Sequence, residues 1–340
     1  MVRLGPGDDE TSRRSRKKLW RLVFSYAPDW ALTIIFTAIS YALNEVTGFK
    51  RQFSVSDTSL LHPFAVHERV PDWALYIIAV VAPFSIQLFV NYISVRSWWD
   101  LHNSTLGLAL GLSLAGMVTQ FTKITVGRPR PDLISRCHPA PGTVDPPFGL
   151  SSVAICTSFD LLEDGFRSFP SGHSSLSFAG LGFLAFYLAG KMHLFDRRGQ
   201  AKSWIAITPL CGAALVAISR TMDYRHHWQD VVVGSLLGLT LSYFSYLQYF
   251  PPLTSEDSHL SYSPRIHQVD PVALDHAPLS THAEYSGGVD ATMHAYSEDA
   301  EDSEDVELLD GTIRRDEPGP LRQLWKERGQ RRVEGADSAV

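Results

Sequence analysis

Six apolar segments, each about as long as a helix that crosses a lipid bilayer, lie between Trp30 and Phe250. They cover residues 30–46, 73–95, 102–125, 171–189, 203–220 and 228–250. A membrane-spanning α-helix needs about 20 mostly apolar residues, and its backbone must satisfy its own hydrogen bonds in hydrocarbon. The sequence therefore predicts an all-α protein, a six-transmembrane helix bundle, and argues against two soluble domains.

Charge divides the chain near residue 250. Residues 251–340 contain 8 basic and 19 acidic residues and carry a net charge of −11, whereas residues 1–250 carry +5. The acidic part has few large apolar side chains, a composition typical of disorder. The sequence thus predicts a basic N-terminal arm (1–28), a six-span domain (29–250) and an acidic disordered tail (251–340).

Basic residues outside the spans predict how the bundle is oriented. They cluster in the N-terminal arm and between the fourth and fifth spans, at Lys191, Arg197, Arg198 and Lys202. Because loops rich in Lys and Arg stay on the cytoplasmic side, both termini are expected in the cytoplasm. The loops 47–72, 126–169 and 221–227 then face the outside or a lumen. Asn103, in the sequon Asn-Ser-Thr, faces the cytoplasm in this topology and is expected to be unglycosylated.

The first of three polar clusters is Lys123 to Asp132 (KITVGRPRPD), at the outer end of the third span. Lys123 and Arg130 can both reach one anion, through an ammonium group and a planar guanidinium group. The neighbouring prolines stiffen the chain around Arg130. Cations that reach out to lipid headgroups are the alternative. Positive charge gathered on the outer side, however, runs against the orientation rule.

The second cluster is Phe169 to Ser175 (FPSGHSS), at the start of the fourth span. Pro-Ser before an apolar run indicates a helix start, where free N–H groups bind anions. Gly172 lets the backbone approach such an anion closely, Ser171 adds a hydroxyl group, and His173 lies beside it. A capping serine with an ordinary histidine at a helix end explains the cluster equally well when it is taken alone.

The third cluster is Ser219 to Asp230 (SRTMDYRHHWQD), between the fifth and sixth spans. Charged groups beside hydrocarbon are costly and usually mark a site. If helical, His226 and Asp230 share one face, so the carboxylate can hold the imidazole and activate it. A metal site formed by His226, His227 and Asp230 is the alternative, but the surrounding cations would repel a metal ion. All three clusters supply phosphate binders or histidines at one membrane face.

The three clusters, in this order, resemble the signature motifs of the type 2 phosphatidic acid phosphatase superfamily. Lys-x6-Arg-Pro matches residues 123–131, Pro-Ser-Gly-His matches 170–173, and Ser-Arg-x5-His-x3-Asp matches 219–230, with no departure at a signature position. The six spans and the sequence Asp-Tyr-Arg-His-His at 223–227 resemble integral-membrane lipid phosphate phosphatases, especially fungal diacylglycerol pyrophosphate/phosphatidate phosphatases. The resemblance covers residues 25–250.

The resemblance implies a role for each matched residue. His226 would be the nucleophile that forms a phosphohistidine, with Asp230 orienting it. His173 would protonate the leaving group and then activate water. The phosphoryl oxygens would be held by Lys123, Arg130, Ser171, Gly172 and Arg220. The resemblance implies neither a metal ion nor any other cofactor.

The implied substrates are membrane phospholipids that carry a phosphomonoester or a diphosphate: phosphatidate, lysophosphatidate and diacylglycerol pyrophosphate. Polyprenyl diphosphates and sphingoid-base phosphates are alternative substrates, and a catalytically silent lipid-binding scaffold is an alternative function. Related vanadate haloperoxidases are soluble, which argues against that activity. The lipid bilayer is an expected partner and nucleic acid is not. Vacuole, Golgi, endoplasmic reticulum and plasma membrane all fit an active site outside the cytosol, and the oligomeric state is not predicted.

The chain has three cysteines, which form no zinc-binding pattern. Cys137 and Cys156 lie in the same loop, on the expected non-cytosolic side of the membrane. Disulfides form and persist in such compartments, so these two residues can be bridged.

Overall fold

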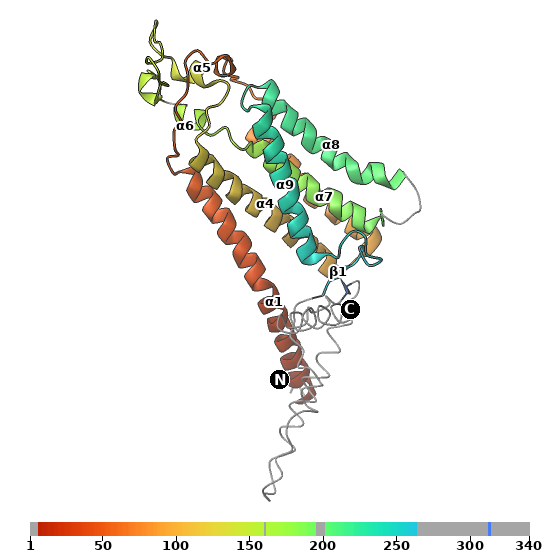
Figure 1. Cartoon of the computed structure of the whole chain (residues 1–340). Coiled ribbons are helices and arrows are strands. Elements are labelled where there is room, and N and C mark those ends of the chain that lie inside the picture. The colour runs from red at the N-terminus through yellow and green to blue at the C-terminus, as the bar shows by residue number, and fades with distance from the viewer. Residues whose placement is uncertain (1–5, 160, 195–200, 264–311, 314–340) are drawn as a thin grey trace, which may run out of the picture.

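Long helices packed side by side form the body of the molecule, and loops with short helices cover one end of it (Figure 1). The computed structural model describes residues 6–159, 161–194, 201–263 and 312–313. The elements are α1 (Pro6–Asn44), η1 (Thr58–Leu60), α2 (Asp72–Tyr76), η2 (Ile77–Val81), α3 (Ala82–Val90), η3 (Asn91–Val95), α4 (Trp98–Val126), α5 (Leu133–Cys137), η4 (Val153–Ile155), α6 (Leu162–Gly165), α7 (Gly172–Lys191), α8 (Ala201–Met222), α9 (Trp228–Tyr249), β1 (Ser261–Tyr262) and β2 (Thr312–Ile313). The only strands in these residues are β1 and β2, a short parallel pair, so the predicted helical class is confirmed.

The long helices end within a few residues of the predicted spans, apart from the N-terminal extension of α1. The second span is a continuous helix from α2 to η3, with π-helical turns at η2 and η3. Within the described residues, five helices are long and apolar enough to cross a membrane: Val23–Asn44, Asp72–Val95, Trp98–Val126, Lys202–Met222 and Trp228–Tyr249. Large apolar side chains remain exposed on their outer faces, among them Phe89, Leu215 and Phe244. Such faces suit contact with lipid.

The remaining long helix, α7, lies inside the bundle and packs against α4, α8 and α9 (Figure 1). Small residues along α7 allow the backbones of neighbouring helices to approach it closely. At Gly180, for example, a Cβ atom would lie 1.8 Å from the carbonyl oxygen of Ala79. A helix surrounded by other helices does not need the composition of a lipid-facing one.

The start of α7 is in direct backbone contact with the first three turns of α9. A Cβ atom at Gly234 would lie 2.6 Å from the Ser171 carbonyl oxygen, and one at Gly238 would lie 2.2 Å from that of Ser175. Two glycines four residues apart let helices approach closely. The backbone N–H of Ser171 donates to the carbonyl of Asp230 at 3.0 Å. The second and third sequence clusters are therefore joined through their backbones.

Residues 47–71 and 127–170 form a cap over one end of the bundle (Figure 1). This cap contains the short helices α5 and α6. The cap has its own apolar core, made of Phe53, Leu60, Leu133, Cys137, Cys156, Leu162 and Phe166. Cys137 and Cys156 form a disulfide, as the sequence allowed, with a Cα–Cα distance of 4.6 Å. The cap is thus a small cross-linked structure rather than two open loops.

Removing this disulfide is expected to destabilise the cap. Because the bridged residues are 19 apart in sequence, replacing both by serine should lower the free energy of unfolding by about 3 kcal/mol. Thermal unfolding of the detergent-solubilised protein measures the effect. Cys211→Ser is the matched control, since Cys211 is unpaired and exposed on α8. An unchanged melting temperature in the Cys137→Ser/Cys156→Ser variant would contradict a stabilising role.

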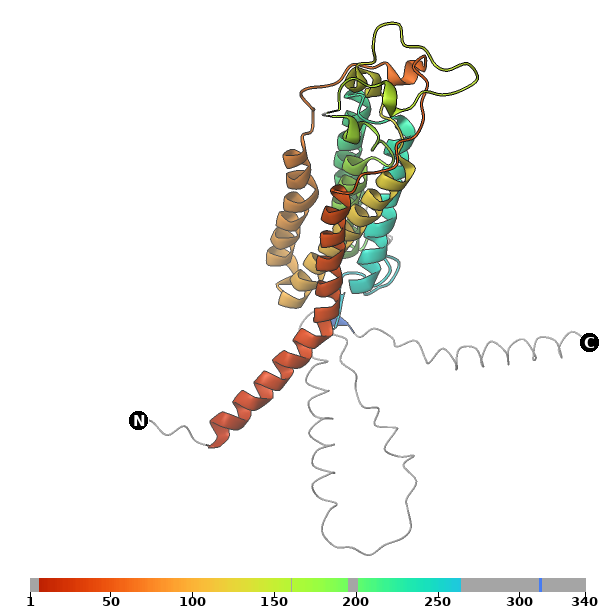
Figure 2. The same ribbon diagram turned by 90° about the vertical axis from the view of Figure 1, so that its left-hand side faces the viewer.

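The opposite end of the bundle contains the N-terminal part of α1 and residues 251–263. α1 is one helix from Pro6, and it contains Pro28, so there is no break between a basic arm and the first span. Figure 2 shows the N-terminal part of α1 turning away from the bundle. Residues 251–263, placed in the tail by composition, pack against the helices; the Lys191 ammonium group donates to the His259 carbonyl. Residues 264–311 and 314–340, the rest of the predicted tail, lie outside the described residues.

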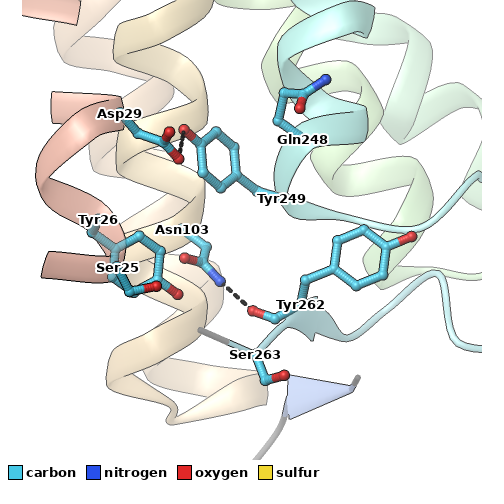
Figure 3. Close-up of a pocket in the computed structure, with 8 residues that line it drawn as sticks. All are labelled: Ser25, Tyr26, Asp29, Asn103, Gln248, Tyr249, Tyr262 and Ser263. Carbon is cyan, nitrogen blue, oxygen red and sulfur yellow. Dashed lines mark hydrogen bonds between the residues drawn. The ribbon is translucent and has the colours of Figure 1, made fainter. Parts of the chain in front are cut away.

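Figure 3 shows a small polar pocket at this end, between α1, α4, α9 and β1. Its volume is about 20 Å³, enough for roughly one water molecule. Tyr249 donates to Asp29 at 3.0 Å, and the Asn103 amide donates to the Tyr262 carbonyl at 2.8 Å. The Asn103 side chain is fully buried. Burial supports the prediction that this sequon is unglycosylated.

Candidate active site

The three sequence clusters meet beneath the cap, where α4 and α8 end and α7 and α9 begin (Figure 1). His226 interacts electrostatically with Arg130, Lys123 and His173. His173 in turn interacts with Arg220, Lys123 and Arg130. Both candidate histidines and the three candidate phosphate-binding cations therefore lie close together beneath the cap.

His226 lies in the turn between α8 and α9 and is 96 % buried, with an exposed fraction of 4 %. Its Nδ1 atom is 2.6 Å from the carbonyl oxygen of Ser168. A carbonyl oxygen only accepts hydrogen bonds, so Nδ1 carries the proton and Nε2 keeps its lone pair. Burial, followed by the charges of Arg130 and Lys123, holds the pKa of His226 well below its usual value. This shift favours the neutral imidazole, the form in which Nε2 keeps a lone pair.

The predicted contact between Asp230 and His226 is not the one that forms. The Asp230 carboxylate pairs with Arg128 at 2.6 Å, accepts from the Ser168 hydroxyl at 2.6 Å, and accepts from the His227 backbone N–H at 3.1 Å. The prediction assumed one helix from His226 to Asp230. In the structure His227 is the N-cap of α9, so His226 precedes the helix and does not share a face with Asp230.

His173 occupies the first turn of α7, with Nε2 3.0 Å from the carbonyl oxygen of Val70 in the cap. Ser171 is the N-cap of that helix; its buried hydroxyl accepts from the Ser174 N–H at 3.4 Å. A Cβ atom at Gly172 would lie 3.1 Å from Nζ of Lys123. Glycine therefore leaves room for the ammonium group beside the N-terminus of α7, where anions are stabilised.

Each of the two motif arginines is buried and held by a carboxylate from the cap. Arg130 donates from Nη2 to Asp164 at 2.6 Å, and its buried Nε has no partner. Arg220 donates from Nη1 to Glu68 at 2.7 Å and from Nη2 to the Val70 carbonyl at 2.9 Å. Burial works against ionisation of Asp164, but the charges of Arg130 and Arg136 hold its pKa well below its usual value. The carboxylates of Glu68 and Asp164 set the direction of the two guanidinium groups.

Four residues of the site were not singled out from the sequence: Glu68, Arg128, Asp164 and Ser168. Arg128 lies in the Arg-Pro-Arg-Pro run of the first cluster, and Ser168 lies two residues before Pro170, so both were adjacent to a motif. Glu68 and Asp164 come from loops with no pattern of their own. Only the folding of the cap brings them to the arginines.

The alternative metal site lacks a set of ligands among the described residues. Across residues 6–159, 161–194, 201–263 and 312–313, no group of three His, Cys, Asp or Glu side chains is placed to hold a metal ion. His227 instead caps α9, with Nδ1 3.3 Å from Asp230. Its position is accounted for by the start of the helix.

The structure is a bundle of apolar helices, typical of a membrane protein, with two histidines and three buried or partly buried cations gathered at one end. Residues 104–252 match the model of the PAP2 superfamily, and the chain belongs to this family.

Several similar proteins are named as lipid phosphate phosphatases or diacylglycerol pyrophosphate phosphatases. Lipid phosphate phosphatase 2 of Arabidopsis thaliana is 44% identical over 228 residues, which cover 66% of this chain and 77% of the relative. The probable diacylglycerol pyrophosphate phosphatase 1 of Schizosaccharomyces pombe is 40% identical over 256 residues, which cover 72% of this chain and 88% of the relative. Diacylglycerol pyrophosphate phosphatase 1 of Saccharomyces cerevisiae is 38% identical over 265 residues, with 76% and 88% covered.

Proposed function

We propose that this protein is an integral-membrane lipid phosphate phosphatase that hydrolyses phosphatidate, lysophosphatidate and diacylglycerol pyrophosphate through a phosphohistidine, without a metal ion. The observation that carries the proposal is the neutral, buried imidazole of His226, whose Nδ1 is held by Ser168 and whose Nε2 is left for attack. Lys123 and Arg130 act on that imidazole and supply positive charge. These cations do the work that a metal ion does in other phosphatases.

In the first step, Nε2 of His226 attacks phosphorus while the bond to the leaving oxygen breaks. Lys123, Arg130 and Arg220 stabilise the phosphoryl oxygens, aided by N–H groups at the start of α7 near Gly172. The unpartnered Nε–H of Arg130 is a donor available for this charge. His173 transfers a proton to the departing oxygen, so the leaving group departs with that oxygen protonated. The leaving group is diacylglycerol when the substrate is phosphatidate, and phosphatidate when the substrate is diacylglycerol pyrophosphate.

In the second step, His173 accepts a proton from water as the water oxygen attacks phosphorus. The phosphorus–Nε2 bond breaks, inorganic phosphate forms, and the electron pair returns to His226. Microscopic reversibility lets the same histidine act first as acid and then as base. The cap keeps Glu68 and Asp164 on the two arginines throughout, so the guanidinium groups are oriented before the substrate arrives.

The proposed topology has six spans: the five helices that are long and apolar enough to cross a membrane, and α7. Its 20 residues are long enough to cross hydrocarbon. Both termini are then cytoplasmic, and the capped end faces a lumen or the outside. The disulfide within the cap supports this side, because such bonds persist in oxidising compartments.

The class of substrate follows from the position of the site. The histidines lie at the ends of the helices, so a headgroup phosphate can enter while the acyl chains stay beside the apolar outer faces of the bundle. The names of the relatives favour phosphatidate and diacylglycerol pyrophosphate over polyprenyl diphosphates or sphingoid-base phosphates. A silent scaffold would have no use for the arranged histidine pair.

Phosphate release from phosphatidate and from diacylglycerol pyrophosphate in mixed micelles, with excess EDTA, tests the proposal. We expect release from both lipids, because no step uses a metal ion, and the ratio of the two values of kcat/KM identifies the preferred lipid. Activity that disappears with EDTA and returns with a divalent cation would contradict the mechanism. No release from any phosphate ester would leave the scaffold as the better function.

A further inference from the structure

Ser168 is fully buried between the Asp230 carboxylate and the imidazole of His226, and it uses all three of its polar groups there. Its hydroxyl donates to Oδ2 of Asp230 at 2.6 Å. Its carbonyl accepts from Nδ1 of His226 at 2.6 Å. Its backbone N–H donates to the carbonyl of Arg128 at 3.1 Å. One side of the residue therefore faces the acid and the other faces the candidate nucleophile.

Arg128 completes this arrangement from a second direction. Its carbonyl holds the Ser168 backbone, and its side chain pairs with the same Asp230 carboxylate at 2.6 Å. Asp230 also anchors the start of α9 through the N–H of His227. The orientation of the Ser168 carbonyl is thus determined by groups from the first and third clusters together. The carbonyl in turn determines which imidazole nitrogen carries the proton.

We infer that Ser168 is a positioning residue for the reaction proposed above, and that Asp230 and Arg128 act on His226 through it. When Nε2 bonds to phosphorus, the imidazole gains positive charge, and the hydrogen bond from Nδ1–H to the carbonyl strengthens. The Asp230 carboxylate stabilises this charge through the serine hydroxyl rather than by touching the ring. The inference rests on the proposed role of His226 as nucleophile.

Ser168→Ala tests this role because it removes the hydroxyl while leaving the backbone carbonyl in place. A hydrogen bond to a charged group contributes about 1.5–3 kcal/mol, so we expect kcat to fall by about tenfold or more, with KM changed by less than about twofold. Single-turnover labelling with a ³²P-lipid should show slower formation of the phosphohistidine. Ser168→Thr, which keeps a hydroxyl, should recover most of kcat.

Ser245→Ala is the matched control. Ser245 is also fully buried, and its hydroxyl donates to the Ser242 carbonyl within α9, remote from the cap. The control should keep wild-type kcat and KM. Equal losses in the two variants, or a threonine variant no better than alanine, would show that Ser168 only packs and would overturn the inference.

A double-mutant cycle with Asp230→Asn tests whether Asp230 acts on His226 through Ser168 or by another path. If Asp230 acts through Ser168, the losses in kcat from Ser168→Ala and Asp230→Asn do not multiply in the double variant. Losses that multiply would mean that Asp230 acts by another path. If the alanine variant does not fold, Ser168→Cys, with nearly the same shape and a weaker donor, replaces it in the same comparison. Wild-type protein that forms no phosphohistidine would instead remove the proposed function itself.

Discussion

His226→Ala is expected to lower phosphate release by about ten thousandfold or more, because a covalent mechanism has no route around its nucleophile. The loss should appear in kcat with every lipid substrate. Acid-labile ³²P labelling of the quenched protein should vanish together with turnover. Phosphate release and labelling in mixed micelles with EDTA measure both effects.

His227→Ala is the matched comparison for this prediction. Its imidazole caps α9 and contacts Asp230, so the variant should lose some rate but still become labelled. A label retained in His226→Ala and lost in His227→Ala would assign the nucleophile to the neighbouring residue. The burial of His226 and its contact with the Ser168 carbonyl favour His226 as the nucleophile.

His173→Ala is expected to separate the two chemical steps. With phosphatidate, whose alkoxide needs a proton to depart, kcat should fall by about 10²–10⁴-fold. With an aryl phosphate, whose phenolate leaves unprotonated, the first step should persist while hydrolysis of the phosphohistidine remains slow. We therefore expect a burst of about one phenolate per enzyme, followed by little turnover.

Rapid-mixing absorbance of the released phenolate, with labelling at the same time points, measures this burst. Wild type should show turnover with little label, and His173→Ala should show label that accumulates. Steady turnover of the aryl phosphate at the wild-type rate would contradict a role for His173 in the second step. The contact between His173 and the Val70 carbonyl indicates that the cap positions this base.

The comparison of sequence and structure is instructive at α7. Length predicted a span at residues 171–189, and the structure has a helix at Gly172–Lys191. The sequence did not show that this helix lies inside the bundle, where Gly180 meets the backbone of Ala79. Apolar length predicts a helix, but it does not tell which helix is enclosed by the others.

The contact of Asp230 is one that the sequence predicted incorrectly. Spacing placed this carboxylate on the His226 ring, but α9 begins at Trp228, two residues later than the spacing argument needed. The carboxylate therefore turns to Ser168 and Arg128. A shift of two residues at a helix start redirects a side chain completely, and local sequence does not determine such boundaries to that accuracy.

The sequence by itself determined the long helices, the two candidate histidines and the cations around them, because apolar length and motif spacing are local properties of the chain. Tertiary structure alone decided which group touches which. Glu68 reaches Arg220 from 152 residues away, and Asp164 reaches Arg130 from a separate loop. Ser168 stands between Asp230 and His226 for the same reason: buried polar groups must find partners, and the partners available depend on how the cap packs on the bundle.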